Sequence, residues 1–207
     1  MHPPAHSIPA NTPRVPARRP SAAPREILEA AEAVLLEDGV GGVSIRKVSD
    51  RCGYSAPTIY HHFGDKQGLI DHLLEARFRR GYEVMAAIPP SDDPAAHLRA
   101  MAEAFVAFAR RHPRHYQLLF QAGLRDVESV PSATAARELV RRDLERLAAT
   151  GRLASDDREA AFEVLWAVVH GVISLYLGTA GEELAPNLLE LTLDVVVAGL
   201  LRRGDAR

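Results

Sequence analysis

Residues 43–66, which read VSIRKVSDRCGYSAPTIYHHFGDK, contain two short helical patterns separated by a tight turn. The first pattern begins at Ser44, a residue type that caps helix N-termini well, and it places Ile45 and Val48 three residues apart on one face. Gly53 interrupts the pattern, because glycine adopts a left-handed backbone at little energetic cost. The sequence therefore predicts a helix of about two turns followed by a sharp change of direction.

The second pattern starts immediately after this turn. Ser55 is its expected N-cap, and Pro57 falls within the first helical turn, where a missing backbone N–H does little harm. Ile59 and Phe63 are four residues apart and face the same side, toward the protein interior. Two helices joined by a three-residue turn around glycine form a helix-turn-helix, whose second helix enters the major groove of DNA.

The rest of the chain shows helical periodicity and no sustained β alternation. Nine helices are predicted, at about residues 25–36, 44–51, 55–62, 66–87, 94–111, 114–122, 132–150, 156–179 and 186–203. The expected fold is all-α, with an N-terminal three-helix unit and a C-terminal helical domain. The expected boundaries are a disordered Pro- and Arg-rich tail at 1–23, a helix-turn-helix domain at 24–80 that includes the start of the connecting helix, and a second domain at 81–207.

The formal net charge of −2 gives no global basic field, so any nucleic-acid partner has to be recognised through a local distribution of charge. Residues 44–66 supply one, with four basic side chains against two acidic ones: Arg46, Lys47, Arg51 and Lys66 against Asp50 and Asp65. The three basic residues of the first helical pattern are expected to stay in solvent.

Cys52 is the single cysteine, which excludes an internal disulfide framework and suits a reducing cytoplasm. The most apolar stretch, 164–180, is 17 residues long, at the lower limit for a membrane span. We interpret it as a buried helix in a soluble oligomer. A cytoplasmic protein without a secretory signal or membrane contact is expected.

The helix-turn-helix resembles that of the TetR family of one-component bacterial regulators. Four runs carry the resemblance: Ser44-Ile45-Arg46-Lys47-Val48, Cys52-Gly53-Tyr54-Ser55, Thr58-Ile59-Tyr60-His61-His62-Phe63 and Asp65-Lys66. The resemblance implies a DNA-binding transcriptional regulator, by family default a repressor, that binds a palindromic double-stranded operator as a homodimer. It also implies release from DNA when a small organic, mostly apolar effector binds the C-terminal part.

The residues expected at the DNA lie at the start of each helix of the motif and of the helix that follows: Ser44, Arg46, Ser55, Ala56, Pro57, Thr58, Tyr60, His61 and Lys66. The resemblance assigns Tyr60 to a phosphate and Thr58 to a phosphate or a base edge. It assigns Lys66 to the DNA backbone, at a helix N-terminus that also favours an anion. Ser44 is explained equally well as a helix cap with no role at the DNA.

Residues 160–178, which read AAFEVLWAVVHGVISLYLG, are apolar nearly all round, so this helix must be covered on more than one side. Within it, Trp166, His170 and Gly171 resemble the WHG-type C-terminal domain of one branch of the family. The last two predicted helices are expected to pair with those of a second copy in a four-helix bundle; they are 156–179 and 186–203.

An apolar ligand pocket is expected among the helices between residues 94 and 178. The candidate lining residues are Met101, Phe105, Phe108, Tyr116, Leu119, Phe120, Phe162, Trp166, Val169 and His170. Ordinary core packing explains most of these side chains as well. A structural hydrogen bond is the favoured role of His170, since buried histidines are normally paired.

No enzyme activity, cofactor or metal is expected, because the sequence shows no convergent nucleophile, acid–base pair, phosphate loop or metal-ligand set. His61 and His62 project about 100° apart on a helix and do not suit a shared ion. Two other functions remain open. One is a thiol-responsive regulator acting through Cys52, although packing is the favoured role of this residue. The other is a helical ligand-binding dimer that does not bind DNA.

Overall fold

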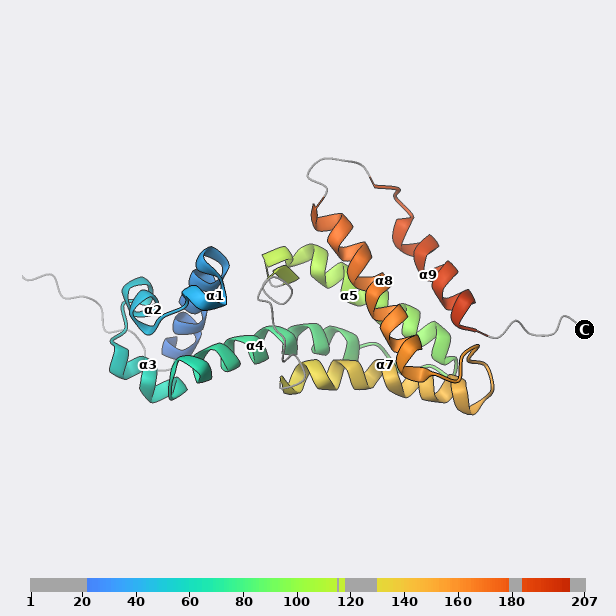
Figure 1. The fold of residues 1–207 in the computed structure, drawn as a ribbon, viewed down its shortest axis with the longest axis horizontal. Helices are drawn as coiled ribbons and strands as arrows, with labels where there is room; N and C mark the ends of the chain where they lie inside the picture. Colours follow the sequence, from blue (N-terminus) through green and yellow to red (C-terminus); the bar gives the residue numbers. More distant parts are fainter. Residues whose placement is uncertain (1–21, 115, 118–129, 179–183, 202–207) are drawn as a thin grey trace, which may run out of the picture.

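The computed structural model describes residues 22–114, 116–117, 130–178 and 184–201, and this part of the chain is all-α, as predicted (Figure 1). Its eight helices are α1 (Ala23–Gly42), α2 (Ile45–Cys52), α3 (Ala56–Phe63), α4 (Lys66–Ala86), α5 (Pro94–Arg111), α7 (Pro131–Ala149), α8 (Arg158–Gly178) and α9 (Leu188–Leu200). Six of the nine residues of the predicted helix at 114–122 lie outside the described residues, and the other three, 114, 116 and 117, are helical. The N-terminal tail lies almost entirely outside the described residues, and the predicted pocket residues Leu119 and Phe120 lie wholly outside them.

Helix α1 reaches Gly42, but its regular conformation breaks at Gly39, close to the end that the sequence predicted near residue 36. Its helical conformation is interrupted only at Gly39, where φ is 71° and ψ is 175°. A positive φ of this size is strained for residues with a side chain, so glycine is the residue type that permits this kink.

Side-chain caps define the helix-turn-helix as the sequence predicted. In three helices an oxygen of the N-cap side chain accepts a hydrogen bond from the backbone N–H three residues later: Lys47 to Ser44 at 3.3 Å, Thr58 to Ser55 at 3.4 Å and Gly68 to Asp65 at 2.7 Å. Gly53 ends α2 in the left-handed conformation, with φ at 72°. These contacts are local in sequence, and each satisfies a backbone group that the helix end leaves free.

The N-terminal core is formed by α1, α2, α3 and the first half of α4. Val48, Ile59 and Leu69 are fully buried in it, as their spacing predicted. Two residues from the start of α7, Val130 and Ala133, belong to the same buried cluster. The N-terminal core therefore extends, through the packing of α4 against α7, to an element that comes much later in the chain.

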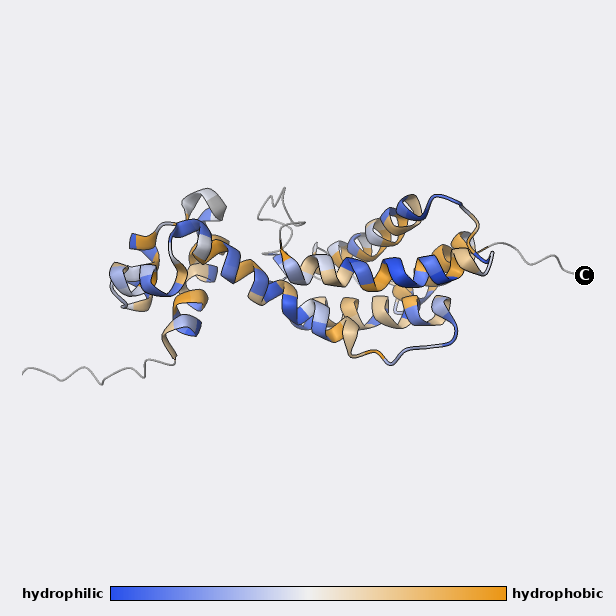
Figure 2. Cartoon of the chain, turned by 90° about the horizontal axis from the view of Figure 1, so that it is seen from below, coloured by the Kyte–Doolittle hydropathy of each residue, from blue (hydrophilic) through white to orange (hydrophobic). Residues whose placement is uncertain are grey.

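Helix α4 connects this core to the C-terminal helices (Figure 1). Hydrophilic and apolar residues alternate along it (Figure 2), since one side packs and the other faces solvent. Arg77 on α4 forms an ion pair with Glu32 on α1, and both side chains are 13% exposed. This pair ties the middle of α4 to the N-terminal unit.

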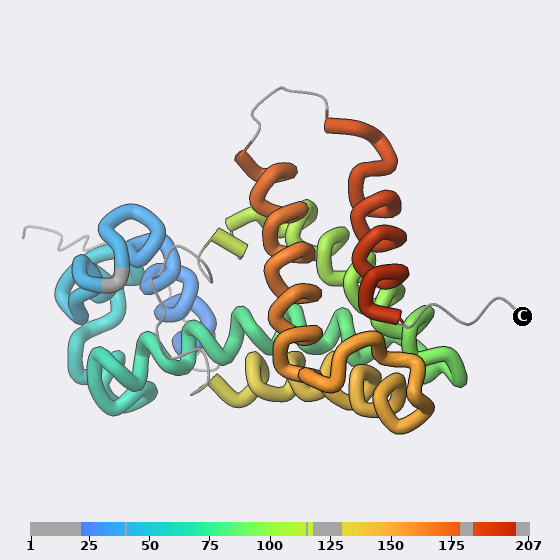
Figure 3. Tube along the Cα trace, turned by 45° about the vertical axis from the view of Figure 1, so that its right-hand side comes forward, coloured from blue at the N-terminus to red at the C-terminus, as the bar shows by residue number. Residues whose placement is uncertain are grey.

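The C-terminal part is a second packed unit of α5, α7, α8 and α9. Helices α8 and α9 lie side by side and run in opposite directions (Figure 3). By length and composition α8 is apolar enough to cross a membrane, the only helix in the described ranges of which this is true. Six of its residues, among them Phe162, Leu165 and Ile173, are buried within the protein, so α8 is a core helix with one uncovered side.

Candidate nucleic-acid interface and apolar pocket

Helix α3 presents a polar face to solvent at its N-terminal end. Six of the residues predicted to face DNA lie together here: Ser55, Pro57, Tyr60 and His61 are exposed, and Ala56 and Thr58 are half-buried. The opposite face is fixed in place because Ile59 and Phe63 are buried in the N-terminal core. The hydroxyl oxygens of Ser55 and Thr58 lie 2.9 Å apart, and Tyr60 is 48% exposed. A short helix of this kind can offer hydroxyl and imidazole groups to a groove without rearranging.

Two cations and one hydroxyl predicted at the same interface flank α3. The Arg46 side chain is 91% exposed, and its ion pair with Asp50 is long, at 3.9 Å. Lys66 is exposed at the first residue of α4. Ser44 is half-buried, and its hydroxyl oxygen caps α2. An exposed ion pair of this length contributes little to stability, so Arg46 can exchange Asp50 for another anion. Lys66 is exposed and is likewise available to an anion.

The two remaining basic residues of α2 are exposed, as expected, but each also forms an ion pair that the sequence did not indicate. Lys47 Nζ lies 2.9 Å from Asp38 Oδ2, and Arg51 Nη2 lies 2.8 Å from Glu37 Oε2. The hydrogen bond with Glu37 raises the pKa of Arg51. Glu37 and Asp38 lie near the C-terminus of α1, where the negative end of the helix dipole disfavours acidic side chains. Their ion pairs with Arg51 and Lys47 offset this unfavourable interaction.

Cys52 is 6% exposed and lies in the N-terminal core. This burial agrees with the packing role that the sequence favoured and disfavours reaction of the thiol with reagents in solution. Within the described part of the chain, no three His, Cys, Asp or Glu side chains are grouped so as to hold a metal ion.

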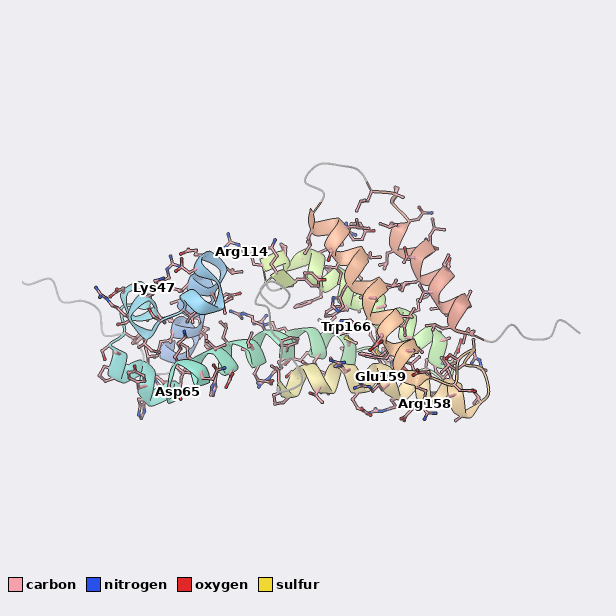
Figure 4. The ribbon with its side chains drawn as sticks, viewed as in Figure 1. Lys47, Asp65, Arg114, Arg158, Glu159 and Trp166 are labelled. Carbon is pink, nitrogen blue, oxygen red and sulfur yellow. The ribbon has the colours of Figure 1, made fainter. Side chains whose placement is uncertain are left out.

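An apolar cavity of about 80 Å³ lies between α4, α5, α7 and α8. Six of the predicted residues line it: Met101, Phe105, Phe162, Trp166, Val169 and His170. Phe108 and Tyr116 do not line it and pack behind it, Phe108 against the Phe105 ring and Tyr116 against His170. Figure 4 shows Trp166 among the C-terminal helices, well away from Lys47 and Asp65 in the N-terminal unit.

His170 is held by a neighbouring aromatic residue. Its Nδ1 lies 3.0 Å from the Tyr116 hydroxyl, and the Trp166 ring centroid is 4.0 Å from the imidazole centroid. Burial lowers the pKa of His170 to about 3, so the imidazole is neutral at physiological pH. The hydrogen-bonding partner of this imidazole nitrogen is the side chain of Tyr116.

Sequence reasoning missed the wall of the pocket that α4 provides, because the pocket was expected only between residues 94 and 178. Phe78, Gly81 and Tyr82 of α4 line the cavity. A Cβ atom at Gly81 would lie 3.2 Å from Cε2 of Phe105, so glycine allows a close approach of α4 and α5 here. A glycine inside a long helix lowers helix stability, and this was the signal that could have found the wall.

Sequence reasoning also missed Arg137 of α7, which lines the cavity. Its guanidinium carbon lies 5.0 Å from the centroid of the Phe162 ring and 5.7 Å from that of the Trp166 ring. Nothing in the pattern of the helix distinguishes this arginine from the others of α7. Its position in the pocket follows only from the packing of α7 against α8.

Two family models match the chain. "Bacterial regulatory proteins, tetR family" matches residues 27–73, and "Tetracyclin repressor-like, C-terminal domain" matches residues 98–200. Among curated proteins, the chain is 36% identical over 70 residues to the tetracycline repressor protein class A from transposon 1721 of Escherichia coli, covering 34% of this chain and 32% of that protein. It is 35% identical over 68 residues to the transcriptional repressor AcnR of Corynebacterium glutamicum, covering 33% and 36%. The chain thus spans about a third of the length of these relatives.

Solved structures match over most of the chain. A TetR family transcription regulator from Marinobacter aquaeolei VT8 has a TM-score of 0.73 at 14% identity, covering 88% of this chain and 97% of that one. A protein of unknown function from Rhodococcus sp. RHA1 has a TM-score of 0.69 at 25% identity, covering 92% and 100%. The two family models together match well over half of the chain, one on the helix-turn-helix and one on the C-terminal helices. The chain therefore belongs to the TetR family of non-enzymatic, DNA-binding transcriptional regulators.

Proposed function

We propose that this protein is a homodimeric repressor that binds a palindromic operator and is released by a small, mostly apolar effector. The observation that carries the proposal is the outward polar face of α3, backed by the buried Ile59 and Phe63. In this arrangement Tyr60 and Lys66 contact phosphates, and Thr58 contacts a phosphate or a base edge. The DNA-binding domain is residues 24–80, and residues 81–207 bind the effector and the second copy.

The uncovered side of α8 and α9 supports dimerisation. Val164 and Leu175 on α8 are 46% and 48% exposed, and Leu191 and Val195 on α9 are 51% and 72% exposed. Large apolar side chains gathered on two neighbouring helices mark an interaction surface. Pairing with the same surface of a second copy gives a four-helix bundle with two-fold symmetry, which matches a palindromic operator.

The position of α4 supports a coupling between effector and DNA. Phe78, inside α4, packs against the N-terminal core and also lines the pocket, and Lys66 is the first residue of the same helix. An effector that enlarges the pocket would shift α4 relative to α7, moving the two α3 helices of the dimer out of register with successive major grooves. In this proposal Trp166, His170 and Gly171 form the WHG-type feature of the C-terminal domain.

The decisive experiment is selection of bound sequences from random duplex DNA by the full-length protein. We expect enrichment of inverted repeats whose half-sites are about one helical turn apart. Enrichment of unpaired half-sites would contradict a symmetric dimer. If the protein binds no duplex at any salt concentration, the result would instead favour a helical ligand-binding dimer that does not bind DNA. The proposed place of action is the cytoplasm, with the Cys52 thiol reduced and buried.

A further inference from the structure

Among the described residues that line the pocket, Arg137 alone carries a charge at neutral pH. The other lining side chains are apolar except for Tyr82 and His170. His170 contributes no charge, because burial lowers its pKa to about 3. Among the described lining residues, a single fixed positive charge therefore faces a cavity whose walls are otherwise uncharged and mostly apolar.

One N–H donor of the Arg137 guanidinium, at Nε, has no acceptor within the described part of the protein. The guanidinium rests against the Phe162 and Trp166 rings, and the Nε atom is buried. A cation–π contact attracts the charge but provides no acceptor for the N–H donors. Arg137 itself is half-buried, but a buried N–H donor without an acceptor is unfavourable, so an acceptor that reaches Nε would gain a favourable hydrogen bond.

The acidic side chain on the adjacent helix is already engaged elsewhere. Glu159 of α8 accepts two hydrogen bonds from Arg141, at 3.1 Å from Nε and 2.6 Å from Nη2. The hydrogen bond from Arg141 lowers the pKa of Glu159, and Arg137 adds only a weaker charge–charge attraction. Arg141 is thus paired, whereas Arg137, one helical turn earlier on α7, is left facing the cavity.

We propose that the pocket binds an organic monocarboxylate, whose apolar body packs among Met101, Phe105 and Trp166 and whose carboxylate accepts hydrogen bonds from Arg137. This inference rests on the proposed function, since it names the class of effector for the same pocket. A carboxylate fits the planar fork of arginine. A doubly charged phosphate would bring more negative charge into apolar walls than one arginine can balance.

The size of the cavity adds a requirement. Its volume of about 80 Å³ is smaller than the cavity of roughly 150 Å³ that admits benzene in another protein. A carboxylate with a chain or ring must therefore displace a wall. Phe105, which closes against Gly81 of α4, is the side chain placed to move, and its movement would press on the connecting helix.

Trp166 provides the measurement, because it is the only tryptophan of the chain and lines the pocket. The full-length protein is titrated with octanoate and 1-octanol, and with phenylacetate and 2-phenylethanol, while tryptophan fluorescence is followed. Within each pair the apolar body is alike and only the charged group differs. We expect each acid to bind at least about tenfold more tightly than its alcohol, as a charge-assisted hydrogen bond would provide.

Substitutions on α7 assign the preference to one residue. Arg137→Gln is expected to abolish the roughly tenfold preference for the acids while leaving alcohol binding within about twofold, and Arg137→Lys is expected to restore part of it. Arg141→Gln, which removes the same charge one turn away, is the matched control and should retain the preference. Circular dichroism and thermal unfolding establish that each variant is folded.

Equal binding of acid and alcohol by the unaltered protein overturns this inference, as does an undiminished preference in Arg137→Gln or a lack of binding by both acids. The same titrations on the operator complex separate it from the proposed function. If the acids bind through Arg137 but do not release DNA, the proposed ligand class is supported and the proposed release by effector is contradicted. Release of DNA by acids and alcohols alike leaves the proposed function standing and contradicts the ligand class.

Discussion

The carboxylate of Glu75, in the middle of α4, accepts two hydrogen bonds from Ser132 in the first turn of α7: one from the backbone N–H at 3.0 Å and one from the hydroxyl at 2.6 Å. The N-cap residue of α7, Val130, provides no side-chain hydrogen bond of its own. A side chain of the connecting helix thus caps a helix that forms the pocket wall. Burial alone would raise the pKa of Glu75, but the hydrogen bonds from Ser132 and Arg79 lower it.

Removing this tertiary cap should weaken the fold. We expect Glu75→Ala to lower the free energy of unfolding by about 1–2 kcal/mol, because two donors at the α7 terminus lose their acceptor. Urea denaturation measures the effect. Glu83→Ala, which removes an exposed acid from the same helix, is the control and should change stability by less than about 0.5 kcal/mol. A similar loss in both variants would show that the cap contributes nothing specific.

Lys66 should bind DNA through charge and without reading sequence. We expect Lys66→Ala to weaken binding to all duplexes alike and to reduce the slope of log affinity against log salt by about one unit, since one phosphate contact is lost. Arg80→Ala removes an exposed charge from the same helix outside the proposed interface and should leave the slope unchanged. A loss confined to certain sequences at constant slope would rule out the phosphate contact.

Stability should depend on pH through His170. Its pKa is about 3 in the folded protein and 6.5 when unperturbed, so below pH 6.5 the unfolded chain binds a proton that the folded protein does not. The free energy of unfolding should therefore decrease as the pH is lowered. This residue alone should account for a decrease of about 2 kcal/mol between pH 7.5 and pH 5. His170→Gln should show a correspondingly smaller fall in urea denaturation at the two pH values. Parallel losses in both proteins would assign the acid sensitivity to other groups.

The exposed side of α9 should hold the dimer together. Val195 is 72% exposed in the single chain, so Val195→Glu introduces no strain within the subunit but places a charge in the proposed apolar interface. We expect the dimer dissociation constant to rise at least about 100-fold, as measured by sedimentation equilibrium. Glu190→Gln, on the same helix, serves as the control. An unaltered dimer in the Val195 variant would place the interface elsewhere.

The sequence by itself determined the parts of the protein that depend on neighbours along the chain. Ser44, Ser55 and Asp65 cap helices through bonds to the third residue beyond them, and Gly53 ends α2 because of its own backbone freedom. The inward faces of the helix-turn-helix follow from the helical period in the same way. These interactions act within about one helical turn, so the local sequence is sufficient to predict them.

Only the tertiary structure decided which distant residues meet. Glu75 and Ser132 are 57 positions apart, Gly81 approaches Phe105 across two helices, and Arg137 reaches the pocket while Arg141 does not line it. The helical period places each of these residues on a face, but the angle and register at which two helices pack determine the side chain opposite it. That geometry depends on the fit of the whole core, and for this reason the helix-turn-helix could be read from the sequence whereas the pocket, its α4 wall and its single charge could not.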